Sequence, residues 1–188
     1  MRAICRPSLL CLTLAVALAL QPALSSEPAK ALVFRFPKVS GLGTLETVVG
    51  SNADLVGLDR MYSNKRKLAN AIGTVKLPVD QCRFVFFRPG LTLIRNPQLL
   101  DAISPENITA LRFSFTSTCD SEEALADGLV AKISHLKNLR NINCSDCDLS
   151  DMGAKGLHDL PQLKLLDLGR TMITAKTLPV LSKLLGLE

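Results

Sequence analysis

The residues best suited to chemistry in this chain are Cys144 and Cys147, which form a C-x-x-C motif. Two cysteines at this spacing can act as a thiol-disulfide redox pair or supply half of a tetrahedral zinc site. A zinc site needs two further ligands, and the sequence offers neither a second C-x-x-C nor paired histidines. A redox pair usually has its first cysteine at a helix amino terminus, where the thiol pKa falls. An exported thiol-redox or metal-binding protein that uses these two cysteines is therefore one hypothesis.

Other catalytic patterns are absent from the sequence. The Gly41-Leu42-Gly43 stretch does not make a dinucleotide loop, because Glu46 stands where the third glycine is needed. No phosphate-binding P-loop and no G-x-S-x-G nucleophile motif occur. The two histidines, His135 and His158, fall beside the apolar positions of the expected helices, so we expect both at the surface. The sequence thus predicts no catalytic residue, no metal site and no cofactor, and we expect a protein that is not an enzyme.

The elements that hold the C-x-x-C motif repeat with a period of 24 residues. The first unit reads Leu139-x-x-Ile142-x-Cys144-x-x-Cys147-x-Leu149, followed by Leu157-x-x-Leu160. The second reads Leu163-x-x-Leu166-x-Leu168-x-x-Thr171-x-Ile173, followed by Leu181-x-x-Leu184. Residues two apart on a strand share a face, so Ile142 and Cys144 are expected to point inward. The period therefore favours a structural role for both cysteines, because Cys144 takes the position of Leu168 and Cys147 that of Thr171.

The motif L-x-x-L-x-L-x-x-(N/C/T)-x-L resembles the leucine-rich repeat. The ending Thr171-Met172-Ile173-Thr174 resembles the T-x-I-T variety that is common in bacterial exported repeat proteins. This resemblance implies an α/β solenoid with parallel strands on a concave face and helices on a convex face. Ser150 and Thr174 share one phase ahead of the helical stretches, where each is expected to cap a helix. Ala175 departs from the pattern, because many such repeats carry an acidic residue at that position.

The repeat pattern divides the chain. Regular units span residues 139–162 and 163–186, and a longer unit spans 108–138, with a helix expected from Ser121 to Lys132. Residues 79–107 are expected to form a degenerate unit. Residues 26–78 lack the period and are expected to form a small β-rich N-terminal cap, with strands over 32–37, 41–45 and 72–78. The basic run Lys65-Arg66-Lys67 is expected in a solvated loop, with a phosphate or anionic-surface contact as the alternative.

Residues 1–25 have the order of a secretory signal peptide. Arg2 and Arg6 precede an apolar run over residues 9–20, and Ala23-Leu24-Ser25 offers small residues for cleavage. As a helix that run would rise about 18 Å, short of the roughly 30 Å core of a bilayer. We therefore expect a protein without a membrane span, secreted or located in the periplasm or cell envelope. The sequence leaves open the disulfide state of the four remaining cysteines, Cys82, Cys119, Cys144 and Cys147.

The expected partner is a protein. Removal of the signal peptide lowers the net charge from +5 to +3, too mild a balance to indicate a nucleic acid. The leucine-rich-repeat resemblance implies that the concave face binds proteins, and aromatic and arginine side chains are enriched at such contacts. Two columns of strand residues are expected to project from that face: Arg112, Asn143 and Asp167, and Phe115, Asp146 and Arg170. The sequence thus predicts a protein-interaction or scaffolding module without catalytic activity. The alternatives are the thiol-redox or metal-binding protein and a structural segment of a longer repeat array.

Overall fold

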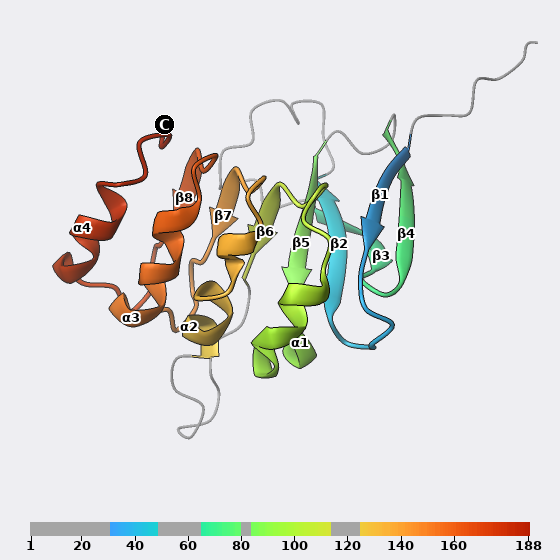
Figure 1. Cartoon of the computed structure of the whole chain (residues 1–188), viewed down its shortest axis with the longest axis horizontal. Coiled ribbons are helices and arrows are strands. Elements are labelled where there is room, and N and C mark those ends of the chain that lie inside the picture. The colour runs from blue at the N-terminus through green and yellow to red at the C-terminus, as the bar shows by residue number, and fades with distance from the viewer. Residues whose placement is uncertain (1–30, 49–64, 80–83, 114–124) are drawn as a thin grey trace, which may run out of the picture.

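In a computed structural model, the chain forms a six-stranded sheet in the order β3–β2–β5–β6–β7–β8 and a two-stranded sheet of β1 and β4 (Figure 1). The structure describes residues 31–48, 65–79, 84–113 and 125–188. The predicted signal peptide, Phe115 and the start of the helix expected at Ser121 lie outside the described residues. The strands are β1 (Ala31–Arg35), β2 (Gly43–Val48), β3 (Lys65–Asn70), β4 (Thr74–Pro78), β5 (Val85–Pro89), β6 (Ala110–Arg112), β7 (Asn141–Asn143) and β8 (Leu165–Asp167).

Strands β5 to β8 are parallel, and their apolar residues align across the sheet. Leu111 is paired with Phe87 on one side and with Ile142 on the other, and Ile142 is in turn paired with Leu166. Equivalent hydrogen bonds join successive units: the Lys164 N–H donates to the Arg140 carbonyl at 2.8 Å, and the Glu188 N–H donates to the Lys164 carbonyl at 3.0 Å. The fold is therefore of mixed α/β class with a mostly parallel sheet, which confirms the predicted α/β class.

Short helical segments follow the parallel strands and lie along one side of the sheet (Figure 1). The α-helices are α1 (Leu91–Arg95), α2 (Leu125–Val130), α3 (Asp151–Ala154) and α4 (Leu178–Leu181). The 3-10 helices span Pro97–Ala102, Ile133–His135, Lys155–Asp159 and Ala175–Thr177. Both predicted caps are confirmed, because the Ser150 hydroxyl accepts the Met152 N–H and the Thr174 hydroxyl accepts the Lys176 N–H. Each bond satisfies a helix-end N–H that has no partner within the helix.

The main apolar core lies between the sheet and these helices. The inward positions of the first regular unit are all buried: Leu139, Ile142, Cys144, Cys147, Leu149, Leu157 and Leu160. Their counterparts in the second unit are less well covered, and Leu166, Leu168 and Ile173 are only half-buried. The reason is topological, since β8 is an edge strand that pairs with β7 alone in the described part of the chain.

Strands β1 to β4 all lie within residues 26–78, and two of them extend the main sheet beyond β5. β2 is antiparallel to both β5 and β3. The strands expected over 32–37, 41–45 and 72–78 correspond to β1, β2 and β4, with boundaries shifted by at most three residues. The prediction of a loop at Lys65-Arg66-Lys67 is wrong, because β3 begins with these residues. A charged edge strand lacks the apolar alternation that identifies a half-buried strand.

Candidate interaction surface

The side chains that point away from the helices form what we call the second face of the sheet. Arg112 and Asn143 lie on it, because their strand neighbours Leu111 and Ile142 belong to the main core. The expectation that both project into solvent is wrong: Arg112 is 6% exposed and Asn143 is fully buried. Part of this face has a small apolar cluster of its own, made by Phe86 and Ala110 with Val48 and Phe84 packed against them.

The buried side chain of Asn143 stabilises the turn after β7. Its Oδ1 accepts the Ser145 N–H at 3.1 Å and the Ser145 hydroxyl at 2.9 Å, and its Nδ2 donates to Asp167 Oδ2 at 3.2 Å. Asp167 repeats the turn bond one unit later, accepting the Gly169 N–H at 2.9 Å. Asn and Asp commonly hold turns in this way. The residues of the first predicted column, Arg112, Asn143 and Asp167, are therefore largely structural. Of the three, Asp167 is half-exposed and the other two are buried.

Asp146 and Arg170 form an exposed ion pair at the carboxyl ends of β7 and β8. Arg170 donates to both carboxylate oxygens of Asp146, through Nε to Oδ1 and through Nη2 to Oδ2 at 2.6 Å. The exposed fractions of the two side chains are 76% for Arg170 and 44% for Asp146. The hydrogen bond from Arg170, with a further contribution from Arg112, holds the pKa of the Asp146 carboxyl below its usual value. The structure thus brings two of the three members of the second column together.

The same two residues have a left-handed backbone conformation, with φ of 60° at Asp146 and 54° at Arg170. This region is uncommon for residues other than glycine, and for a long side chain such as arginine more so than for Asp or Asn. The Asp146 N–H donates to the Gly169 carbonyl at 3.0 Å, which links the two turns through the backbone as well. The two turns therefore place both charges side by side.

A second group of charges lies on the second face of the sheet, at β2, β3 and β5. The sequence pattern does not predict this group. Glu46 is buried, and its Oε1 accepts the Thr44 hydroxyl at 2.8 Å and Arg88 Nη1 at 3.3 Å. Burial lowers the pKa of Lys65, and the positive charges of Arg112 and Arg88 lower it further, against the opposing effect of Glu46. These side chains meet through antiparallel pairing of strands that do not follow the 24-residue period, so no spacing in the sequence indicates the group.

The cysteine pair lies inside the core. Cys144 and Cys147 are both buried free thiols, and Cys147 Sγ donates to the Cys144 carbonyl at 2.7 Å. Burial raises the pKa of the Cys144 thiol well above its usual value, whereas the hydrogen bond with Cys144 lowers the pKa of Cys147. A buried neutral thiol is a poor nucleophile, because the thiolate is the reactive form. Within the described ranges, no group of three His, Cys, Asp or Glu side chains is arranged to hold a metal ion.

The two histidines differ in their surroundings. His158 is exposed as expected, with Nδ1 at 2.6 Å from the Lys155 carbonyl oxygen. His135 is half-buried, which corrects the expectation of a surface position, and its Nε2 lies 3.4 Å from the Ile103 carbonyl oxygen. Both rings contact backbone carbonyls, which is consistent with structural positions.

Carboxylates also join the helical segments of successive units. Asp127 accepts the Ser150 N–H at 2.8 Å and the Ser150 hydroxyl. One unit later, Asp151 accepts the Thr174 N–H at 2.9 Å and the Thr174 hydroxyl at 2.6 Å, together with the Thr177 hydroxyl. These bonds, with that from the Thr174 hydroxyl the largest, lower the pKa of Asp151 to about 2. Their contribution is structural, since each carboxylate links one unit to the next.

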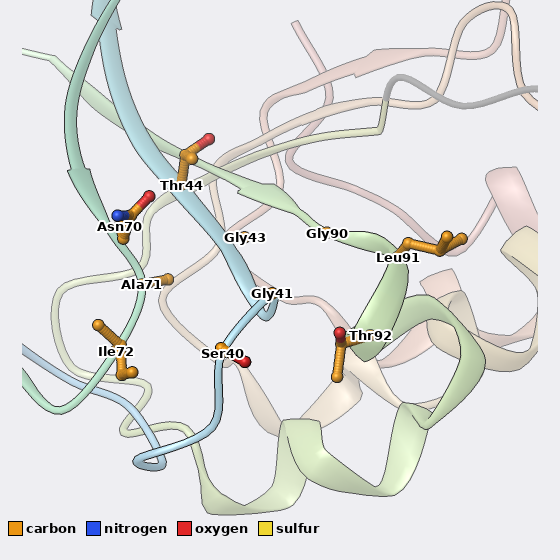
Figure 2. A pocket seen from close by; sticks show the side chains of 10 residues that line it. All are labelled: Ser40, Gly41, Gly43, Thr44, Asn70, Ala71, Ile72, Gly90, Leu91 and Thr92. Carbon is orange, nitrogen blue, oxygen red and sulfur yellow. The ribbon is translucent and has the colours of Figure 1, made fainter.

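A cavity of about 450 Å³ lies where β2 begins and β5 ends (Figure 2). Its lining comes from three segments and consists of Ser40, Gly41, Gly43, Thr44, Asn70, Ala71, Ile72, Gly90, Leu91 and Thr92. Gly90 is required by close packing, since a Cβ there would lie 2.3 Å from the Gly41 carbonyl oxygen. The lining offers hydroxyl and amide groups but no titratable side chain, so it has no group for acid–base catalysis. No predicted site residue lines it.

Comparisons with protein-family models, curated proteins and solved structures find no match to this chain. In the described part of the chain, none of the helices is both long enough and apolar enough to cross a membrane.

Proposed function

We propose that the chain is an exported leucine-rich-repeat protein that binds a protein partner through the exposed Asp146–Arg170 pair and has no catalytic activity of its own. The proposal rests on this pair, because formation of the two turns does not by itself require charged side chains. Glycine adopts the left-handed conformation without steric cost, and asparagine tolerates it. Residues with charged side chains at both positions instead present a pre-oriented carboxylate and guanidinium at the sheet edge. Pre-orientation lowers the entropic cost of binding.

The repeat assignment is supported by the motif and by the stacking of residues 139–162 on residues 163–186. The two units share turn bonds, helix caps and paired apolar strand residues at equivalent positions. We assign residues 26–78 as the cap and residues 79–188 as the repeat region. Export is supported by the composition of residues 1–25, and it places the protein in the secreted fraction, the periplasm or the cell envelope.

The two alternatives have unequal support. Burial of Cys144 and Cys147 disfavours the thiol-redox or metal-binding function, because exchange and ligation both need an accessible thiolate. The half-buried apolar side chains of β8 are compatible with a structural segment of a longer repeat array, in which a further unit would cover them. That alternative is not exclusive, since an array can also bind a partner through its sheet face.

The test reverses the charges of the pair, and it distinguishes a direct contact with the partner from a purely structural role in the two turns. A partner is isolated on the immobilised full chain, identified, purified, and its Kd measured against four variants: Arg170→Glu, Asp146→Arg, the double reversal, and Lys183→Glu as an exposed control. We expect each single reversal to weaken binding roughly tenfold, which corresponds to about 1.4 kcal/mol. The double reversal restores an ion pair of opposite orientation, so the midpoint of thermal unfolding should return to the wild-type value while binding stays weak. Recovery of binding in the double variant would show that the pair only stabilises the turns and does not contact the partner, which would refute the proposal.

A further inference from the structure

Positive charge is concentrated in the strands of the N-terminal part. In residues 31–48 and 65–79, six lysines and arginines accompany one acidic residue, Glu46, which is buried against Arg88. All six cations are exposed: Arg35, Lys38, Lys65, Arg66, Lys67 and Lys76. Residues 125–188 are nearly balanced by comparison, with eight cations and seven acids. The excess charge of the described chain therefore lies in this N-terminal part, and three of the six cations, Lys65, Arg66 and Lys67, are consecutive on β3.

β3 is the edge strand at this end and pairs only with β2 among the described residues. In an antiparallel strand, alternate residues direct their N–H and C=O groups to the side away from the partner. Lys65 and Lys67 are paired with Val48 and Glu46, so their side chains lie on the second face, whereas Arg66, opposite Thr47, points to the other face. A strand added to this edge would thus meet a cation on both of its faces.

Cations of the inner strands act on Lys65 at this edge. The charges of Arg112 on β6 and Arg88 on β5 both disfavour the charged form of Lys65. A carboxylate placed at this edge would reduce the repulsion. Charged side chains, lysine above all, discourage an edge strand from pairing with a further strand of similar sequence, and the same charges attract a strand of opposite charge.

We propose that the outer edge of β3 binds an extended acidic polypeptide segment by strand addition, with carboxylates of the segment paired to Lys65, Arg66 and Lys67. The edge offers a row of cations at strand spacing together with backbone donors and acceptors, which match an extended peptide rather than a compact anion. Opposite charges on directly facing residues stabilise such pairings. The surface lies at the opposite end of the sheet from Asp146 and Arg170 and is independent of the function proposed for that pair.

The experiment uses the full chain and a fluorescein-labelled peptide with a central run of consecutive glutamates, whose carboxylates alternate between the two faces of a strand, and binding is followed by fluorescence anisotropy at low salt. The variant Lys65→Glu/Arg66→Glu/Lys67→Glu should weaken binding by about a hundredfold, because three attractive pairs become repulsive. The matched control Lys155→Glu/Lys176→Glu/Lys183→Glu changes the net charge equally at three exposed lysines of the other half and should change the affinity no more than about twofold. Hydrogen exchange should slow at alternate amides of residues 65–70 when the peptide is bound. Far-UV circular dichroism checks that both triple variants are folded.

Three results would overturn the proposal. Equal weakening by the two triple variants would show non-specific attraction to a basic protein. Self-association of a Lys65→Thr/Arg66→Thr/Lys67→Thr variant, with no peptide binding by the wild type, would show that the cations only protect the edge. Tighter binding to vesicles containing phosphatidylserine, or to a single-stranded oligothymidylate, would show that the surface recognises another class of polyanion.

Discussion

Replacement of Gly153 by alanine tests the packing of successive units, because two effects of known size oppose each other. Gly153 lies in α3, where alanine is favoured over glycine by about 1 kcal/mol on helix propensity. In the folded chain, however, a Cβ at this position would lie 2.3 Å from Asp127 Oδ1 and 2.5 Å from Asp127 Cα. The second contact is with backbone of α2, so a rotamer change cannot relieve it, and α2 and α3 must move apart.

The cost of that movement has two parts. Overpacking of a close contact costs about 1–3 kcal/mol. Separation of the helices also weakens the bonds that the Asp127 carboxylate accepts from the Ser150 N–H and hydroxyl, and hydrogen bonds to charged groups contribute about 1.5–3 kcal/mol each when lost entirely. After the gain in helix propensity is subtracted, we expect Gly153→Ala to lower the free energy of unfolding by about 2–4 kcal/mol.

Urea unfolding followed by far-UV circular dichroism measures this difference. The matched control is Gly128→Ala in α2, where the nearest atom to a new Cβ is Pro97 Cγ at 3.3 Å, a side-chain contact that can adjust. We expect the control to lie within about 1 kcal/mol of the wild type. A Gly153→Ala variant as stable as the wild type, or more stable, would refute the close approach of α2 and α3 and with it the tight stacking of the units.

Two further predictions concern groups held inside or between the units. The pKa of Asp151 measured by carboxyl NMR should be about 2, below the unfolded value of about 3.9, so its contribution to stability is present above about pH 4 and is lost as the pH falls toward 2. The wild type and Asp151→Asn should therefore differ in unfolding free energy at pH 6 and converge near pH 2, and a gap that is constant over this range would contradict the assignment. Cys144 and Cys147, being buried, should react with a maleimide only after unfolding, as read from the masses of their tryptic peptides, and rapid labelling of both in the native protein would favour the thiol-redox alternative.

The elements that follow the 24-residue period could be predicted from the sequence, because the period determines which side chains point inward. Ile142, Cys144 and Leu157 are buried as expected, and the caps at Ser150 and Thr174 follow from their shared phase. The period does not determine what covers the second face of the sheet. It therefore gives no signal for the burial of Arg112 on that face.

The strand β3 was missed for a related reason. Helix and strand periods are recognised from apolar residues that recur on one face. The residues from Lys65 to Lys67 include no apolar side chain. Their conformation is determined by pairing with β2, which itself pairs with β5 through the register of Leu45 with Phe87. A sequence analysis that considers each segment separately assigns such a run to a loop, although its charges fit an edge strand.

The side-chain bonds between units do leave a signal in the sequence, and it differs from the apolar period. Asp146 and Arg170 share one phase, are 24 residues apart and carry opposite charges, so parallel stacking in register brings them together. The bonds of Asp127 to Ser150 and of Asp151 to Thr174 both span 23 residues, because the two acids are 24 residues apart and so are the two cap residues. Asn143 and Asp167 share a phase and a turn bond, yet only Asn143 is fully buried, because among the described strands β7 has a neighbour on each side and β8 has one. Phase therefore predicts which side chains meet between units, whereas the number of neighbouring strands decides which of them remain available to a partner, and this favours Arg170 over Asn143 as a contact residue.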